Sequence, residues 1–325
     1  MASARAQVTT ALRHGVRRPG ADDTYADGDD ASWLQVDWPS LQRRIELGGE
    51  QVNVLDTGGS GPPLLFIHGW SANWQAWLLT IPAFMRTHRC VALDLPGFGQ
   101  SPMPAGPISI HGYAATVDAL CDELGIAAVS VIGNSMGGFI GAELALAFPT
   151  RVERLVLVSA AGLSIEQLRP GPALAIARLV DAGLPYASRF ETPIVRRARL
   201  RRAAMQWVVR YPERLSPALT QELVMSTGKP GFLPALEALM SYSFRERLGE
   251  IEIPVLIVWG RQDMMVPVTD ADAYAELIGP NARVVIFDDT GHVPMIERPS
   301  RFNQLVAEFL AGKPAPEQDV EGVST

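Results

Sequence analysis

The chain has 325 residues, of which 47% are hydrophobic and 19% are charged, and these proportions exclude a wholly disordered protein. Its net charge of −7 argues against a general nucleic-acid binder. The longest apolar runs, 62–67 and 254–259, have the length of strands and fall well short of the roughly 20 residues that a membrane-spanning helix needs.

The first 40 residues lack the pattern of a folded element. Four arginines within residues 1–18 are followed by five aspartates within residues 22–30, and no apolar stretch separates the two groups. The segment is therefore not a Sec signal peptide. We expect residues 1–40 to form a flexible leader, residues 313–325 to form a flexible tail, and the protein to be cytoplasmic.

From residue 41 the chain alternates β-type runs with helical patterns, which is typical of a mainly parallel sheet covered by helices. The first two runs, joined by Gly48-Gly49, predict an antiparallel hairpin, and the later runs are rich in Val, Ile and Leu, as in strands buried on both faces. The predicted strands are Arg44–Leu47, Gln51–Asp56, Leu64–Ile67, Cys90–Leu93, Ser130–Gly133, Leu155–Ser159, Val255–Trp259 and Arg283–Phe287. The predicted helices are Ile110–Leu124, Met136–Phe148, Pro267–Ile278 and Ser300–Leu310, with Ser109 and Ser300 in N-cap positions.

The alternation stops between residues 163 and 248, where helical stretches and scattered prolines replace the strands, and it resumes at residue 254. The simplest interpretation is a helical insertion between two strands of one sheet, which divides the core into 41–162 and 249–312. The insertion has 13 Lys or Arg against 7 Asp or Glu, a balance of +6, which leaves −7 − 6 = −13 for the rest of the chain.

Residues 194–209 of the insertion predict a basic helix, with five arginines within seven residues and Trp207 beyond them. One interpretation is a solvated face that pairs with the acidic body of the protein. The other is contact with an anionic membrane surface or with anionic substrates.

The stretch Gly133-Asn134-Ser135-Met136-Gly137 fits G-x-S-x-G and lies between a predicted strand and a predicted helix. A serine on such a tight turn exposes its hydroxyl, and the following helix directs free N–H groups toward developing negative charge. The pattern therefore predicts that Ser135 is a catalytic nucleophile.

A nucleophilic serine needs a base and an orienting acid. Of the five histidines, only His292 combines the end of a strand with a loop position, where open α/β sheets bind their ligands. Asp263 follows the preceding predicted strand and is the expected acid. Asp288 and Asp289 are interpreted as turn residues. The two cysteines, Cys90 and Cys121, lie in apolar surroundings away from any histidine cluster, so we expect neither a metal nor a cofactor.

Over residues 41–312 the chain resembles the serine-dependent α/β-hydrolases. The motifs that carry the resemblance are His68-Gly69-Trp70, Asp94-Leu95-Pro96-Gly97-Phe98-Gly99, Gly133-Asn134-Ser135-Met136-Gly137-Gly138, Trp259-Gly260-Arg261-Gln262-Asp263 and Gly291-His292. The resemblance implies an α/β-hydrolase fold with a mostly parallel eight-stranded sheet and a helical lid at residues 163–248. It also implies an oxyanion hole made by the backbone N–H groups of Trp70 and Met136. His68 and Asp94 are expected to brace loops.

Within this family the expected activity is hydrolysis of a small-molecule carboxylic ester through an acyl-enzyme, as in esterases and lipases. The alternative is C–C bond hydrolysis, as in meta-cleavage product hydrolases, whose nucleophile motif is similar. Asn134 and Trp70 are the expected substrate contacts. A lactone substrate, perhydrolase activity and a ligand receptor that retains the triad are further alternatives.

Overall fold

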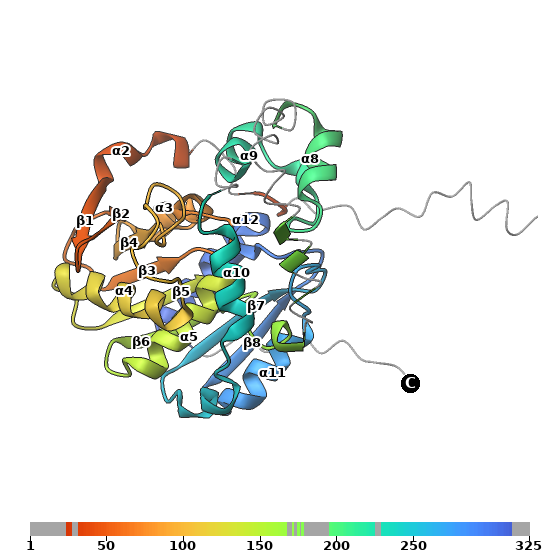
Figure 1. Cartoon of the computed structure of the whole chain (residues 1–325). Coiled ribbons are helices and arrows are strands. Elements are labelled where there is room, and N and C mark those ends of the chain that lie inside the picture. The colour runs from red at the N-terminus through yellow and green to blue at the C-terminus, as the bar shows by residue number, and fades with distance from the viewer. Residues whose placement is uncertain are drawn as a thin grey trace, which may run out of the picture.

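The computed structural model describes residues 24–27, 32–167, 171, 174–175, 177–178, 195–224 and 229–313. It has one eight-stranded sheet with helices on both faces (Figure 1). The strand order is β1-β2-β4-β3-β5-β6-β7-β8; β2 is antiparallel to β1 and β4, and the other neighbouring pairs are parallel. The strands are β1 Gln42–Leu47, β2 Glu50–Asp56, β3 Pro63–Ile67, β4 Arg89–Leu93, β5 Val129–Asn134, β6 Val152–Val158, β7 Val255–Gly260 and β8 Ala282–Phe287.

The predicted α/β-hydrolase fold and all eight predicted strands are confirmed. The β1–β2 hairpin turns at Gly48 and Gly49, whose φ angles of 59° and 89° are readily adopted only by glycine. Along β5, Val131 belongs to the apolar core on one face of the sheet and Ile132 to the core on the other. This two-sided burial explains why the central strands are continuous apolar runs.

Different helices cover the two cores. The core that contains Val131 is closed by α4, α5, α10 and α11, and the core that contains Ile132 by η2, α3, α9, α12 and α13. The α-helices are α2 Trp38–Leu41, α3 Ile81–Phe84, α4 Ile110–Glu123, α5 Met136–Ala147, α8 Ala198–Met205, α9 Pro217–Val224, α10 Phe232–Ser241, α11 Thr269–Ile278, α12 Pro294–Glu297 and α13 Pro299–Leu310. The 3-10 helices are η1 Trp33–Gln35, η2 Trp74–Trp77, η3 Ile165–Gln167, η5 Pro212–Arg214 and η6 Arg245–Glu250.

The predicted N-cap at Ser109 is confirmed, because its Oγ accepts a hydrogen bond from the N–H of Gly112 at 3.0 Å. The predicted N-cap at Ser300 is wrong. Helix α13 begins at Pro299, whose fixed φ suits the first helical position, and its N-cap is Arg298.

The described part of the predicted insertion lies between β6 and β7 and is helical. It contacts the core at Gly231, whose N–H donates to the carbonyl of Gly97 at 2.9 Å. A Cβ on Gly97 would lie 2.9 Å from the Cα of Gly231, so glycine at 97 allows the two backbones to come this close. The predicted basic helix is interrupted: α8 spans Ala198–Met205, and the extended residue Arg197 separates it from the helical residues 195–196.

The described part of the predicted leader corrects the expected boundary at residue 40. Tyr25 and Trp33 are only 3% and 4% exposed and belong to the same core as α12 and α13. The segments 24–27 and 32–40 are therefore part of the folded body, and their aromatic side chains explain why. The rest of the predicted leader, and residues 314–325 of the predicted tail, lie outside the described residues.

No helix within the described ranges has both the length and the apolar composition needed to cross a membrane.

Candidate active site

Ser135 lies on the tight turn between β5 and α5. Its backbone has φ 54° and ψ −118°, which is a strained conformation for any residue except glycine. Its N–H donates to the carbonyl of Val158 at 2.9 Å, which ties the turn to β6. A Cβ on Gly133 would lie 2.2 Å from the carbonyl oxygen of Gly137, so the strand and helix can meet this closely only with glycine at 133.

His292 follows β8 and Asp263 follows β7, so the two parallel strands carry both side chains to one edge of the sheet. Nδ1 of His292 lies 2.8 Å from Oδ2 of Asp263, and the two side chains are 7% and 0% exposed. Oδ1 of Asp263 accepts hydrogen bonds from the N–H groups of Met265 and Val266 at 2.8 and 3.0 Å. Because an ionised carboxylate only accepts, Nδ1 carries a proton and Nε2 of the neutral imidazole is left as an acceptor.

Asn134 joins the Ser135 turn to the His292 loop. Its Nδ2 donates to the carbonyls of Val158 and His292 at 3.1 and 3.2 Å, and the residue is 4% exposed. Both amide protons of Asn134 are therefore used within the protein, and a contact between Asn134 and substrate stays a prediction. A direct bond between Ser135 Oγ and His292 Nε2 is not among the contacts of these described residues, and such bonds are often long before substrate binds.

The loop after β3 lies beside the Ser135 turn. A Cβ on Gly69 would lie 3.1 Å from the Cβ of Ser135. Trp70 and Met136 directly follow Gly69 and Ser135, and their backbone N–H groups make no backbone hydrogen bond within the described part of the chain. That these two groups form an oxyanion hole stays a prediction.

The Trp70 indole packs against the insertion. Its Nε1–H donates to the carbonyl of Phe232 at 2.7 Å, and the two rings lie 4.1 Å apart at 30°. The indole N–H is therefore used to hold the start of α10, and a contact between the Trp70 ring and substrate stays a prediction.

His68 and Asp94 brace the loops next to the site, as predicted. His68 Nδ1 donates to the carbonyl of Gly69 at 2.7 Å, and its Nε2 accepts from the N–H of Leu95 at 3.0 Å. Burial lowers the pKa of His68, which favours this neutral form. The Asp94 carboxylate accepts three hydrogen bonds of 2.8–2.9 Å from Trp74 N, Gln100 N and Asn53 Nδ2.

Sequence reasoning missed Glu297, a fully buried carboxylate beneath the His292 loop. It accepts hydrogen bonds from the N–H groups of Gly291 at 2.9 Å, Val293 at 3.3 Å and Arg210 at 2.8 Å, and from the hydroxyl of Tyr25 at 2.7 Å. Burial raises the pKa of Glu297, and these hydrogen bonds oppose that shift. The only signal in the sequence was a carboxylate within the otherwise apolar run Pro294-Met295-Ile296-Glu297.

The Tyr25 hydroxyl also accepts the N–H of Tyr211 at 2.9 Å, and the two rings meet edge-on at 5.2 Å. The guanidinium of Arg298 lies 5.2 Å from the Tyr25 ring. The N-terminal segment, the insertion and the His292 loop therefore meet at one buried carboxylate. The insertion makes a further contact there, because the N–H of His292 donates to the carbonyl of Val208 at 2.8 Å.

The turn after β8 agrees with the sequence interpretation of its two aspartates. Asp289 has φ 48°, as turn aspartates often do, and Asp288 forms an exposed ion pair with Arg261.

Cys90 and Cys121 are buried, and burial raises the pKa of each thiol to about 12. In the described part of the chain, no three His, Cys, Asp or Glu side chains form a group that could hold a metal ion.

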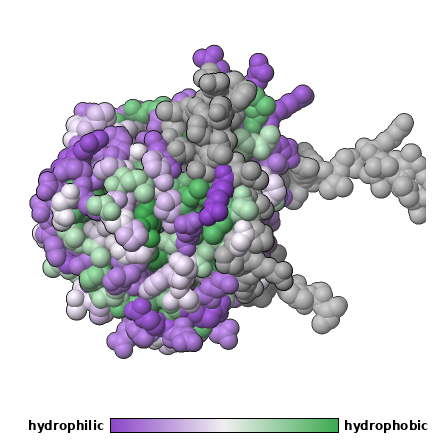
Figure 2. Space-filling model, viewed as in Figure 1, coloured by the Kyte–Doolittle hydropathy of each residue, from purple (hydrophilic) through white to green (hydrophobic). Residues whose placement is uncertain are grey.

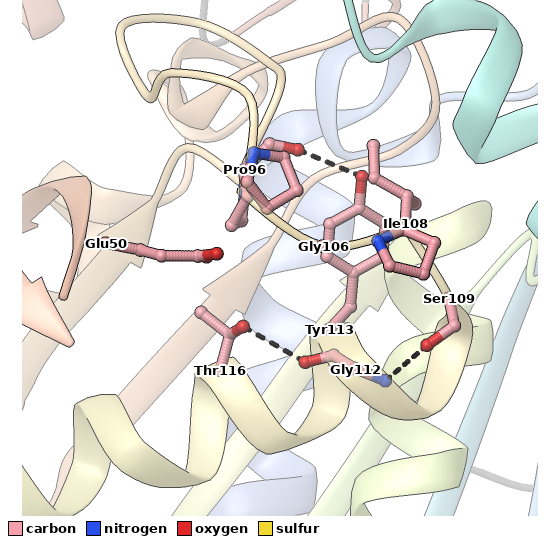
Figure 3. Close-up of a pocket in the computed structure, with 10 residues that line it drawn as sticks. Glu50, Pro96, Gly106, Ile108, Ser109, Gly112, Tyr113 and Thr116 are labelled. Atoms are coloured by element: carbon pink, nitrogen blue, oxygen red, sulfur yellow. Dashed lines mark hydrogen bonds between the residues drawn. The ribbon is translucent and has the colours of Figure 1, made fainter. Parts of the chain in front are cut away.

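A surface pocket lies elsewhere, between the loop 104–109 and the first turns of α4 (Figure 3). The hydroxyl of Tyr113 donates to the carbonyl of Pro96 at its wall. Neither Ser135 nor His292 lines it, so we do not assign it to the chemistry.

Residues 62–299 match the family model of the alpha/beta hydrolase fold, and the chain belongs to this family. The dihydrolipoyllysine-residue acetyltransferase component of the acetoin cleaving system of Cupriavidus necator is 31% identical over 293 residues, covering 87% of this chain and 72% of that protein. The 2-hydroxymuconate semialdehyde hydrolase of a Pseudomonas species is 30% identical over 291 residues, covering 84% and 95%. The solved enol-lactonase of Burkholderia xenovorans has a TM-score of 0.66 and 25% identity, covering 83% of this chain and 100% of that chain. These names describe different reactions, so the family does not define the bond that is cleaved.

Proposed function

We propose that the protein is a serine hydrolase that cleaves carboxylic esters, with Ser135 as nucleophile, His292 as general base and acid, and Asp263 as the orienting carboxylate. The observation that carries this proposal is the buried His292–Asp263 pair, 2.8 Å apart, which Asn134 ties to the Ser135 turn. Support also comes from the strained backbone of Ser135, with φ 54°.

In the proposed reaction, Ser135 Oγ attacks the ester carbonyl carbon while its proton moves to Nε2 of His292. The carbonyl oxygen becomes an oxyanion that accepts hydrogen bonds from the N–H groups of Trp70 and Met136. The alcohol departs with the proton from Nε2, leaving an acyl-Ser135. His292 then deprotonates a water that attacks the acyl carbon, and the acid is released as the proton returns to Ser135.

Asp263 acts through the imidazole. Its carboxylate holds Nδ1–H, so that Nε2 can accept the serine proton, and it stabilises the imidazolium that follows. The two backbone N–H bonds to its other oxygen keep the carboxylate in place. This arrangement requires no metal or cofactor in the steps above.

C–C bond hydrolysis is the second candidate, because the Pseudomonas relative named above is 30% identical over most of both chains. That reaction was expected to use a substrate contact from Asn134. The amide N–H groups of Asn134 bond to two backbone carbonyls, so such a contact through these groups would require one of these bonds to break. A lactone is a cyclic ester and would follow the same steps.

The test is a series of p-nitrophenyl esters of increasing acyl length, run beside a lactone and a meta-cleavage dienoate. We expect ester turnover that Ser135→Ala abolishes and that Asp263→Asn reduces by about 10³–10⁴ in kcat. Ser300→Ala, an exposed serine on α13, is the matched control and should retain activity. A fluorophosphonate probe should label the wild type and Ser300→Ala but not Ser135→Ala. Faster turnover of the dienoate than of any ester would reverse the assignment, and labelling of Ser135→Ala would refute the nucleophile.

A further inference from the structure

Three exposed apolar residues directly precede or follow, in the sequence, residues that hold His292. Trp207 is 56% exposed and directly precedes Val208, whose carbonyl binds the N–H of His292. Met264 and Met265 are 57% and 45% exposed and directly follow Asp263. All three residues are neighbours in the sequence of groups that position one imidazole.

Helix α8, which leads into Trp207, has two different faces. Arg201 is buried and donates to the backbone carbonyls of Val195 and Pro212, so it fastens the helix to the insertion. At 100° per residue, Arg199 lies nearly opposite Arg201 on α8, and Arg196 lies before the helix, beyond the extended residue Arg197. Leu200 lies on the flank of Arg199, and it and both arginines are exposed.

The outer face of α8 carries positive charge that the described residues do not neutralise. Arg202 at its edge lies 3.5 Å from Glu213, but no acidic partner of Arg196 or Arg199 is recorded in the described part of the chain. In Figure 2, hydrophilic side chains project beside hydrophobic ones at the position of α8. We define the α8 surface as Arg196, Arg199, Leu200 and Trp207.

We propose that the α8 surface binds the surface of an anionic lipid bilayer and places the His292 side of the active site against the lipid. Tryptophan and leucine can enter the boundary between headgroups and acyl chains, while arginines bind the phosphates. The charge distribution supports this occupant: the insertion carries +6 and the rest of the chain −13. An anionic membrane therefore attracts this face and repels the others, which orients the molecule.

Binding of the α8 surface to a bilayer does not require that the protein be an esterase. The orientation of the bound protein would, however, bear on which esters the proposed active site can reach. A lipophilic ester in the membrane would lie next to the segment that carries Val208 and His292. This consequence rests on the proposed function, whereas the bilayer contact can be measured with catalytically inactive protein.

The experiment measures co-sedimentation of the full chain with vesicles of phosphatidylcholine alone or with 30% phosphatidylglycerol, at low and high salt. The inactive Ser135→Ala protein is used, so no substrate is consumed and failure of the proposed chemistry does not affect the result. We expect binding to the anionic vesicles that falls with salt. Two arginines near an anionic surface contribute about 1 kcal/mol each, so Arg196→Glu/Arg199→Glu should weaken partitioning by at least about thirtyfold.

The matched control is Arg44→Glu/Arg86→Glu, which makes the same charge change at two exposed arginines on β1 and after α3. Strand β1 lies on the opposite side of the view from α8 (Figure 1). Trp207→Ala should also weaken binding while it leaves the net charge unchanged. Equal loss in the control variant, equal binding to neutral vesicles, or no binding at all would overturn the proposal. Binding of a soluble polyanion but not of vesicles would show that the α8 surface binds an acidic partner and would refute the proposed contact with a bilayer.

Discussion

Tyr25→Phe tests whether the N-terminal segment is part of the folded body. The substitution removes one hydroxyl that donates to Glu297 at 2.7 Å and accepts from the N–H of Tyr211 at 2.9 Å. The ring itself is retained, and so are its edge-on contact with Tyr211 and the guanidinium of Arg298 over its face. The change therefore isolates the polar contacts of one atom.

The lost hydrogen bond to Glu297 has a charged acceptor, and such bonds contribute about 1.5–3 kcal/mol. The Glu297 carboxylate is fully buried, so water does not readily replace the missing donor. The N–H of Tyr211 lies in a half-buried residue and can bind water instead. We expect the free energy of unfolding to fall by about 1.5–3 kcal/mol, measured by urea denaturation followed by circular dichroism.

Tyr242→Phe is the matched control, because its hydroxyl also contacts a carboxylate, that of Glu143, and Arg247 at 3.4 Å, but lies in a half-buried position where water can replace it. We expect a loss of about 1 kcal/mol or less there. A loss below about 0.5 kcal/mol for Tyr25→Phe would refute the role of the N-terminal segment. A changed m-value would mean that the variant altered the unfolded ensemble or the cooperativity instead.

Three further substitutions test residues that hold the loops of the candidate site in place. Asn134→Ala removes both donors that join the Ser135 turn to the His292 carbonyl, and we expect kcat to fall by up to about 10²-fold with little change in the affinity of a product-like inhibitor; an unchanged kcat would contradict the positioning role. Gly260→Ala places a Cβ 1.9 Å from the carbonyl oxygen of Gly291, so the loop must shift, and differential scanning calorimetry should show a clear loss of stability. Burial lowers the pKa of His68 below its ordinary 6.5, so the unfolded chain binds the proton more readily and stability is lost as the pH falls below about 6.5. The stability advantage of the wild type over His68→Gln, measured in urea from pH 7.5 to 5, should therefore shrink at low pH, and a constant advantage would count against the buried neutral imidazole.

The sheet was predictable because its strands carry a local signal. Each central strand is a short apolar run that faces a core on both sides, and turn residues such as Gly48 mark where strands end. The placement of His292 beside Asp263 was predictable for a related reason. Both follow parallel strands, and the ends of parallel strands meet at one edge of the sheet.

The supports of the site were not predictable, because they depend on contacts between distant segments. Nothing near Asn134 in the sequence indicates that its amide reaches a carbonyl 158 residues away, and an asparagine before a nucleophile is equally compatible with a substrate contact. Arg201 lies within a run of arginines, and only the packing of the insertion distinguishes it as the buried one. Composition also misplaced the N-terminal boundary, because two aromatic residues in a charged segment are enough to fasten it to the core.

These supports have one physical feature in common, which bears on how the site stays ordered. The His292 loop is held mainly through backbone groups: its carbonyl by Asn134, its N–H by Val208, and the N–H groups on either side of it by Glu297. Backbone contacts fix the position of the loop, and among the described residues the ring of His292 is hydrogen-bonded by Asp263 at Nδ1. Because Val208 and Arg210 belong to the insertion, a displacement of the insertion, including one caused by the proposed contact of α8 with lipid, would act directly on the loop that carries the proposed catalytic base.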